Sequence, residues 1–336
     1  MRGAIVPVRA LWLACAVLLI GAASAEAKPT AIVAMGDSAV AGESAGNYEP
    51  GTDQPGNFCH RSLNALIHMT SIPGIDATLN LACSGARSAN LFVGGPGQNG
   101  EPAQSVKLAQ AAATYDIKLI FVEVGANDDP QFASVATDCV TRFVLRLVRC
   151  RTGQAATWPS RVAAMQPKVA QAIDSVRSVM AGADPAASYR LVLASYWSPV
   201  TDPPARVSTY AGKLLSGCPL YDVDMDWAHD TAVPLLSAGL QEVAAGKGVH
   251  FLDLSRSAER HEVCAPGITR SQEWISGLTY DPSNAGWFSF DAVRQSFHAN
   301  ARGHAQLGRC LTEFAVLSQA SATCLRGSDG NLHAMP

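Results

Sequence analysis

Residues 31–40 read AIVAMGDSAV, and this segment decides how the rest of the chain is interpreted. Its first five residues are apolar, which is typical of a strand buried on both faces of a parallel sheet. Gly36, Asp37 and Ser38 then end the apolar run with residues that favour a turn. Ser38 is therefore either an ordinary turn serine or a nucleophile held at the end of a strand. The residues that decide between these roles must lie elsewhere in the chain.

Short apolar segments recur along the chain and predict the other strands of the same sheet. They are residues 77–81, 118–124, 191–194 and 249–254. Between them, apolar residues recur at steps of three and four, most clearly over residues 160–180, which predicts helices with one buried face. Strands that alternate with helices predict an α/β fold with right-handed crossovers. We expect a three-layer α/β/α sandwich with a central, mostly parallel sheet.

Composition and the first residues predict an exported globular protein. The 336 residues are 48% hydrophobic and carry a net charge of −3, with no long basic run, which argues against a nucleic-acid partner. Two arginines precede an apolar run that is too short to span a membrane, and small residues follow it. We expect a signal peptide over residues 1–27, cleaved after Ala25 or Ala27, a single domain over 28–325 and a flexible tail over 326–336. The mature protein would be secreted or held in the cell envelope.

Cysteine usage agrees with export. Of nine cysteines, Cys15 lies in the predicted signal peptide and eight remain in the mature chain. An even number in an exported protein indicates disulfides rather than free thiols, although many pairings are possible. We favour sequential neighbours that close local loops. The expected bridges are Cys59–Cys83, Cys139–Cys150, Cys218–Cys264 and Cys310–Cys324.

Polar residues follow the predicted strands at positions that suggest chemistry. Ser38 follows the first strand, Gly85 the second and Asn127 the third, while His298 lies in a late segment before a helical pattern. The carboxyl ends of parallel strands share one edge of a sheet, where reactive groups gather. A serine needs a base to remove its proton, and the oxyanion formed on attack needs donors already aimed at it. These four residues provide the groups needed for acyl transfer.

Each of these residues also has an ordinary structural explanation. A turn accounts for Ser38 alone, an unusual backbone angle accounts for Gly85, and a helix cap accounts for Asn127. None of these explanations requires the other residues to be present. Their joint occurrence, in order and after successive strands, favours the catalytic interpretation.

Four segments occur in the order found in a known superfamily. They are GDS at 36–38, the glycine of CSGA at 83–86, GAND at 125–128 and FHAN-ARGH at 297–304. The pattern resembles the SGNH (GDSL) hydrolase superfamily, and CHRS at 59–62 with the paired cysteines resembles its secreted actinobacterial esterase and lipase branch. The resemblance covers residues 30–315 and implies a flavodoxin-like SGNH hydrolase fold.

The resemblance implies a role for each residue. Ser38 matches the nucleophile, and His298 matches the general base that later acts as an acid. The backbone N–H groups of Ser38 and Gly85, with the side chain of Asn127, match the oxyanion hole. The implied activity is hydrolysis of small-molecule or lipid carboxylic esters through an acyl-enzyme, without metal or cofactor. The alternatives are a carbohydrate acetylesterase or phospholipase on the same scaffold, or a non-catalytic secreted binding module. We expect a monomer without stable membrane insertion.

The sequence departs from the family pattern where the histidine is oriented. Many members have an aspartate three residues before the histidine, whereas this chain has Gln295 there. A backbone carbonyl can accept the Nδ1–H and fix the tautomer, which gives a Ser–His dyad. We expect the Gln295 carbonyl in this role, with Asp291 as the less favoured orienting carboxylate. His304, in the same segment, is interpreted as structural.

Two further segments bear on the substrate. Residues 95–100 match G-x-G-x-x-G, but an internal proline and the lack of a convincing helix favour a loop near the substrate cleft over a dinucleotide site. Residues 128–159 carry large apolar residues directly after the oxyanion segment. We expect a disulfide-tied loop or short helix there that forms one wall of an acyl pocket, with Phe143 and Leu147 affecting chain-length preference. The alternative is that these side chains belong only to the core.

Overall fold

The structure is a computed structural model that describes residues 1, 3–4, 27–278 and 294–336. Within these residues, seven strands form one sheet. The sheet order is β2-β1-β3-β4-β5-β6-β7. All neighbouring strands pair in parallel except β6 and β7. The strands are β1 (Thr30–Gly36), β2 (Ala77–Asn80), β3 (Asp116–Glu123), β4 (Arg190–Ala194), β5 (His250–Asp253), β6 (Ser321–Arg326) and β7 (Leu332–Met335).

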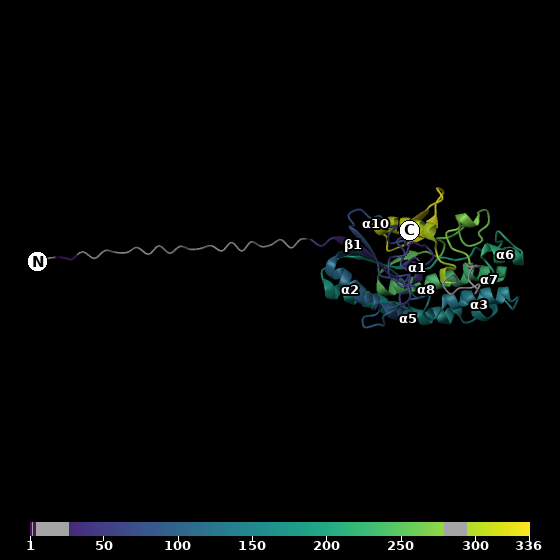
Figure 1. Cartoon of the computed structure of the whole chain (residues 1–336), viewed down its shortest axis with the longest axis horizontal. Coiled ribbons are helices and arrows are strands. Elements are labelled where there is room, and N and C mark those ends of the chain that lie inside the picture. The colour runs from purple at the N-terminus through teal and green to yellow at the C-terminus, as the bar shows by residue number, and fades with distance from the viewer. Residues whose placement is uncertain (2, 5–26, 279–293) are drawn as a thin grey trace.

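Helices cover both faces of this sheet and complete the three layers. In Figure 1, α2, α5 and α3 run along the lower side of the body, while α10 lies near the upper side. On the lower side α5 contacts α2 and α8, and on the upper side α10 contacts β6 and β7. The helices are α1 (Ser38–Ala41), α2 (Gln104–Thr114), α3 (Phe132–Val144), α4 (Arg151–Gln154), α5 (Trp158–Ala183), α6 (Tyr210–Ser216), α7 (Asp222–Trp227), α8 (Val233–Lys247) and α10 (Ala301–Val316).

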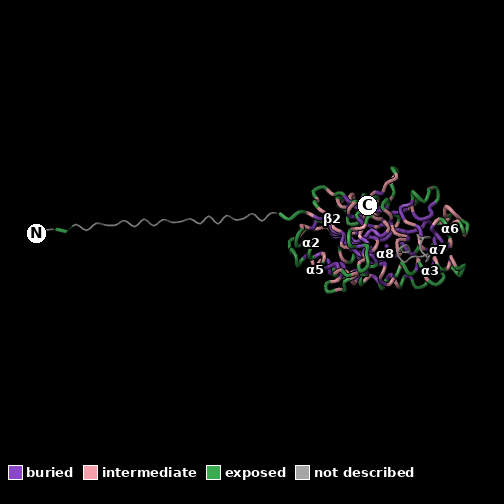
Figure 2. Tube along the Cα trace, in the orientation of Figure 1, coloured by how far each residue is buried: buried purple, intermediate pink, exposed green. Residues whose placement is uncertain are grey.

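The central strands are apolar because helices cover both of their faces. Residues 31–35 of β1 and residues 119–122 of β3 are almost completely buried. A side chain on either face of such a strand meets a helix rather than water, so alternation with polar residues is lost. Figure 2 shows this buried interior and the exposed outer surface of the helices and loops. The expected α/β/α sandwich is confirmed.

The long helix α5 follows the apolar spacing that predicted it. Its buried residues include Val162, Met165, Val169, Ile173, Val176 and Met180. These side chains lie at steps of three and four and therefore share one helix face. The helix α8 packs closely beside it, because a Cβ atom on Gly239 would lie 2.5 Å from Cγ1 of Val162. Glycine at that position lets the two helices approach.

Four disulfides fasten the loops to the sheet and helices. They join Cys59 to Cys83, Cys139 to Cys150, Cys218 to Cys264 and Cys310 to Cys324. These are the sequential neighbours named above. The last bridge ties α10 to β6, and the first ties the segment after α1 to the segment after β2.

The C-terminal residues do not form the flexible tail that was expected. β7 pairs antiparallel with β6 and forms the edge of the sheet. Leu332 is buried, and its backbone N–H donates to the side-chain oxygen of Gln306 on α10 at 2.9 Å. A short strand with one buried apolar residue gives little signal in the sequence, but the neighbouring strand and α10 provide its partners.

Most of the predicted signal peptide, residues 5–26, lies outside the described residues. Within those that are described, no helix is both long and apolar enough to cross a bilayer.

Candidate active site

Ser38 is the first residue of α1 and directly follows β1. Gly36 has a φ of +146°, and a Cβ atom there would lie 2.0 Å from the carbonyl oxygen of Glu123, so only glycine fits. Asp37 caps α1, since its Oδ1 accepts the N–H of Ala39 at 3.0 Å. The turn therefore places Ser38 at the carboxyl edge of the sheet in a defined position.

His298 approaches Ser38 from the other end of the chain. Its Nε2 lies 2.7 Å from Oγ of Ser38. Its Nδ1 lies 3.0 Å from the carbonyl oxygen of Ser296. Because a carbonyl can only accept a hydrogen bond, Nδ1 carries the proton and Nε2 is free to accept the serine proton. The pair has the geometry of a nucleophile beside its base.

The acceptor of the Nδ1–H differs from the one expected from the sequence. It is the carbonyl of Ser296, whereas the carbonyl of Gln295 was predicted. The physical reason is the backbone of Phe297, whose φ of +65° turns the chain so that the preceding carbonyl faces the imidazole. Asp291, the alternative, lies outside the described residues.

The segment that carries His298 is held by backbone hydrogen bonds to Ser276. The N–H of Phe297 donates to the carbonyl of Ser276 at 2.7 Å, and the N–H of Ser276 donates to the carbonyl of His298 at 2.8 Å. The side chain of Ser276 in turn accepts a hydrogen bond from Ser44 at 2.6 Å. The histidine is therefore fixed relative to the segment that follows α1.

The three predicted oxyanion donors line the same cavity as His298. These are Ser38, Gly85 and Asn127. Within the part of the chain that the structure describes, the backbone N–H groups of Ser38 and Gly85 donate to no protein acceptor. One side-chain N–H of Asn127 donates to the carbonyl of Ala86 at 3.1 Å, which leaves the other for a ligand. Asn127 does not cap α3, whose cap residue is Gln131.

A buried carboxylate beside the site acts on the charge of His298. Burial lowers the pKa of His298, and the positive charge of Arg294 lowers it further. The negative charge of Glu43 and backbone hydrogen bonds to Ser296 and Arg294 raise it. Burial opposes ionisation of Glu43, but hydrogen bonds from His60 and Ser84 and the field of His298 lower its pKa below the usual value. The Nδ1 of His60 lies 2.9 Å from the carboxylate. Glu43 is therefore a fixed negative charge on the cavity wall.

Two more carboxyl groups lie near Ser38. Burial raises the pKa of Asp37 to about 7. The hydrogen bond that Tyr196 donates to Oδ2 at 2.6 Å acts in the opposite direction and lowers the pKa. Burial raises the pKa of Glu123 well above its usual value, and the nearby Asp37 raises it further. Among the described residues, neither carboxyl oxygen of Glu123 has a hydrogen-bond partner. Its surroundings therefore favour the protonated form of Glu123, because an unpaired buried charge is strongly unfavourable.

Several of these residues were missed by the sequence reasoning. Tyr196 and Glu123 lie at the carboxyl ends of β4 and β3. The expectation that reactive groups gather at the carboxyl ends of strands, which pointed to Ser38, therefore applies to them as well. Glu43 and Ser84 had no comparable signal, since their contact depends on how the segment after α1 folds against the segment after β2. His60 was noted only within the CHRS segment.

The site opens into a large apolar cavity of about 980 Å³. One wall is the face of α3 formed by Phe132, Ala136, Val140 and Val144, which recur every four residues. The other side includes Trp197, Pro199, Leu278 and Phe297. Gln98 and Asn99 also line it, so the G-x-G-x-x-G segment lies beside the cleft, as expected.

The disulfide-tied segment forms one wall of the cavity, as expected, but the two residues expected to affect chain-length preference do not line it. Phe143 is buried and stacks on Tyr210, with ring centroids 5.1 Å apart, so it belongs to the core. Leu147 is exposed and lies after the end of α3. Each residue of a helix is rotated by about 100° from the previous one, so Val144 faces the cavity while Phe143 turns towards α6. The segment is a helix of 13 residues rather than a loop or short helix.

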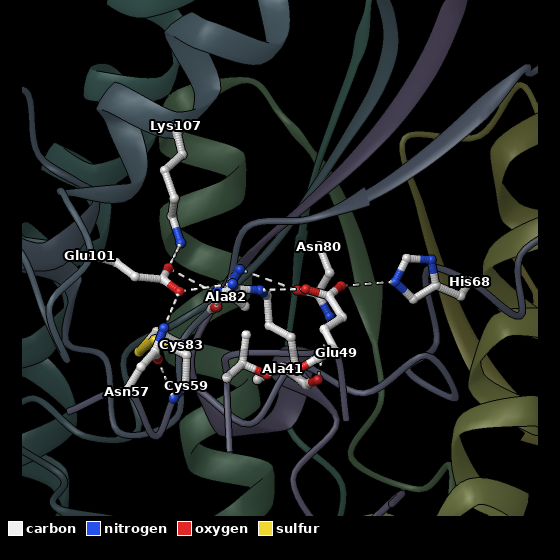
Figure 3. Close-up of polar contacts among 12 residues, drawn as sticks. Ala41, Glu49, Asn57, Cys59, His68, Asn80, Ala82, Cys83, Glu101 and Lys107 are labelled. Carbon is white, nitrogen blue, oxygen red and sulfur yellow. Dashed lines mark hydrogen bonds and ion pairs between the residues drawn. A yellow bond between two sulfur atoms is a disulfide. The ribbon is translucent and has the colours of Figure 1, made fainter. Parts of the chain in front are cut away.

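An ion-pair network supports the loops that carry Gly85. Arg61 contacts Glu49 at 2.9 Å and Glu101 at 2.8 Å, and Lys107 contacts Glu101 at 2.6 Å. Figure 3 shows Glu101 between Lys107 and Asn57, next to the Cys59–Cys83 bridge. Burial opposes ionisation of Glu101, but its three hydrogen-bond donors outweigh burial and lower its pKa to about 2. Glu101 therefore stays ionised across the neutral range.

One group of potential metal ligands is present in the described part of the chain. It consists of Cys139, Cys150 and Asp224. The two cysteines are joined in a disulfide, so they have no thiolate to offer a metal. Asp224 instead accepts the backbone N–H groups of Cys150 and Arg151.

Comparison with known proteins gives a family and a fold. The model of the GDSL-like lipase/acylhydrolase family matches residues 34–306. An extracellular lipase from Streptomyces rimosus is similar in structure, with 21% identity, a TM-score of 0.53 and coverage of 82% of this chain and 94% of that one. A phospholipase A1 from Streptomyces albidoflavus NA297 has 21% identity and a TM-score of 0.52, covering 83% and 95%.

These two likenesses show the shared SGNH hydrolase fold. No curated protein sequence matches the chain significantly. The family match spans the segments of Ser38, Gly85, Asn127 and His298. The chain therefore belongs to the GDSL-like lipase/acylhydrolase family.

Proposed function

We propose that the protein is a secreted serine esterase or lipase that hydrolyses carboxylic esters through an acyl-enzyme on Ser38. The observation that carries this proposal is the contact of 2.7 Å between Ser38 Oγ and His298 Nε2, with Nδ1 held by a carbonyl. This arrangement makes the serine a nucleophile and the histidine a base. The disulfides and the extracellular Streptomyces lipase of the same fold support secretion.

The first half of the reaction forms the acyl-enzyme. Nε2 of His298 takes the proton of Ser38 as Oγ attacks the ester carbonyl. The negative charge that develops on the carbonyl oxygen is stabilised by the N–H groups of Ser38, Gly85 and Asn127. His298 then gives its proton to the leaving alcohol, and the C–O bond of the ester breaks.

The second half releases the acid and restores the enzyme. His298 takes a proton from water, the hydroxide attacks the acyl-enzyme carbonyl, and the same donors stabilise the oxyanion. The proton returns to Ser38 Oγ as the acyl group leaves. The buried charge of Glu43 favours the imidazolium present in both halves, in place of the missing aspartate.

The cavity favours esters with an extended acyl chain over acetyl esters. Its volume of about 980 Å³ and the apolar side chains of α3 that line it suit a hydrocarbon chain. We therefore place the lipase and phospholipase substrates ahead of acetylated glycans. The phospholipase A1 of the same fold supports this order.

A panel of esters tests the proposal. Acetyl, butyryl and long-chain nitrophenyl esters, a phospholipid and an acetylated glycan are compared using wild-type protein and Ser38→Ala. Hydrolysis of the nitrophenyl and lipid esters that disappears in Ser38→Ala is the expected result. Hydrolysis of the glycan alone favours the acetylesterase alternative, and no hydrolysis of any ester favours the binding module.

A further inference from the structure

Five consecutive exposed residues follow α3, and we call residues 145–149 the rim loop. Their sequence is LRLVR. Leu145, Leu147 and Val148 are 61%, 50% and 64% exposed. Three neighbouring aliphatic side chains in water form an unusual surface feature, which in a soluble domain generally marks an interaction site.

The rim loop is held in shape by the residues beneath it. Tyr210 donates from Oη to the carbonyl of Val144 at 2.7 Å, and Tyr221 donates to the carbonyl of Leu147 at 3.0 Å. The Cys139–Cys150 disulfide closes the base of the loop. The aliphatic side chains are therefore presented outward by a fixed backbone, so docking needs little further ordering.

The two arginines of the rim loop each lie over a tyrosine ring. The guanidinium of Arg146 lies 4.4 Å from the ring centre of Tyr210, and that of Arg149 lies 5.2 Å from the ring centre of Tyr221. Among the described residues, no acidic side chain lies within ion-pair distance of either arginine. Both cations are therefore available to an anionic partner.

The acidic groups near the rim loop have other partners. Asp224, the carboxyl group on which the charge of Arg149 acts, accepts the backbone N–H groups of Cys150 and Arg151. Asp138 pairs with Arg142 at 2.7 Å, and Asp226 faces Arg151 at 3.8 Å. Asp222, after Tyr221, pairs with Lys213 at 2.5 Å. The excess charge at the loop itself is therefore positive, in a chain whose net charge is −3.

The rim loop is continuous with the acyl cavity. Val144 and Leu145 line the cavity, and Leu145 is also exposed. An aliphatic surface that leads into an apolar cavity suits a lipid, because the acyl chain can move from the rim loop into the cavity. Alternating aliphatic and cationic side chains match the boundary between acyl chains and phosphates at a bilayer surface.

We propose that the rim loop docks the enzyme on an anionic phospholipid bilayer. The aliphatic side chains enter the boundary of the acyl region, and Arg146 and Arg149 contact lipid phosphates. A lipid ester then enters the cavity past Leu145, a step that rests on the proposed function. The docking itself does not depend on catalysis.

Co-sedimentation with vesicles tests the docking on the full mature chain. The Ser38→Ala variant is used so that the lipids are not hydrolysed. We compare vesicles of phosphatidylcholine alone with vesicles that also contain phosphatidylglycerol. The expected result is binding to the anionic vesicles that weakens as salt is raised, since surface charges are screened.

Two double variants probe the two kinds of side chain. Leu147→Ser with Val148→Ser, and Arg146→Gln with Arg149→Gln, should each weaken binding by about tenfold or more. Val316→Ser and Arg302→Gln on α10 are matched controls, because both positions are exposed, and they should change binding by less than about twofold. None of these four rim-loop side chains lines the cavity, so hydrolysis of a soluble acetyl ester should stay unchanged.

The outcomes separate this inference from the proposed function. Binding that is equal for both kinds of vesicle, or that survives both double variants, overturns the docking. Self-association of the free protein that is lost in the rim-loop variants would show that the surface joins two copies instead. Absence of esterase activity in the wild type would overturn the proposed function and leave the vesicle result valid.

Discussion

Nδ1 of His298 lies 3.0 Å from the carbonyl oxygen of Ser296, so a neutral group orients the base. A carbonyl fixes the tautomer, but it stabilises the imidazolium less than a carboxylate does. The buried carboxylate of Glu43 supplies a negative charge that raises the pKa of the imidazole. The site thus separates orientation and charge stabilisation, which one aspartate provides in a triad.

Removal of either member of the dyad should abolish ester hydrolysis. Ser38→Ala and His298→Ala should each lower kcat/KM by about 10⁴-fold or more, because one removes the nucleophile and the other its base. Asp291→Asn should retain most of the activity, since the dyad needs no aspartate. Steady-state assays with a short nitrophenyl ester measure these changes. A loss of several orders of magnitude in Asp291→Asn would show that the orienting group is wrongly assigned.

Glu43→Gln should move the acidic limb of the pH–rate profile. His298 must be neutral to act as the base, so kcat/KM falls as the pH drops below its pKa. The charge of Glu43 raises the pKa of His298, whereas burial lowers it. Removing the charge lowers the pKa of His298, so the limb should shift to lower pH while kcat decreases. A decrease in kcat with the limb unmoved would indicate only a structural role for Glu43.

Larger side chains on the cavity face of α3 should shorten the preferred acyl chain. Val140→Phe and Val144→Phe fill the cavity and should lower kcat/KM for long-chain esters by about tenfold or more, with acetyl esters much less affected. Leu215→Phe is the matched control, because Leu215 is exposed and does not line the cavity. Competition between acetyl and long-chain nitrophenyl esters measures the ratio. An equal effect of all three variants would mean that α3 does not form the acyl wall.

Loss of the Cys139–Cys150 bridge should destabilise the fold. The bridge closes a loop with a sequence separation of 11, so replacing both cysteines by serine should lower the free energy of unfolding by about 2–3 kcal/mol. Urea unfolding of the oxidised proteins measures the difference. The double variant should also lose more activity on long-chain than on acetyl esters, because α3 carries the cavity wall. An unchanged midpoint and slope would contradict the structural role of the bridge.

The fold and the location of the candidate site residues at one edge of the sheet could be predicted because they depend on local patterns. Apolar runs mark strands buried on both faces, and the carboxyl ends of parallel strands bring Ser38, Gly85 and Asn127 to one edge. The cysteine pairing followed from sequence order. These features need no knowledge of how distant side chains pack.

The remaining features depend on tertiary geometry. The choice of the Ser296 carbonyl over that of Gln295 follows from one backbone angle at Phe297. The role of Val144 rather than Phe143 on the cavity wall depends on how α3 packs against Tyr210. The order at the C-terminus depends on partners in β6 and α10. A single sequence contains no periodic signal for any of these.

Covalent labelling with a fluorophosphonate tests the central claim, that Ser38 is an activated nucleophile beside His298. The mature protein is treated with the reagent, and intact mass and peptide mapping locate the adduct while esterase activity is followed in parallel. We predict one adduct, on Ser38, formed in proportion to the loss of activity and formed far more slowly in His298→Ala. An unlabelled Ser38 in active protein, or labelling that proceeds equally fast without His298, would contradict the account.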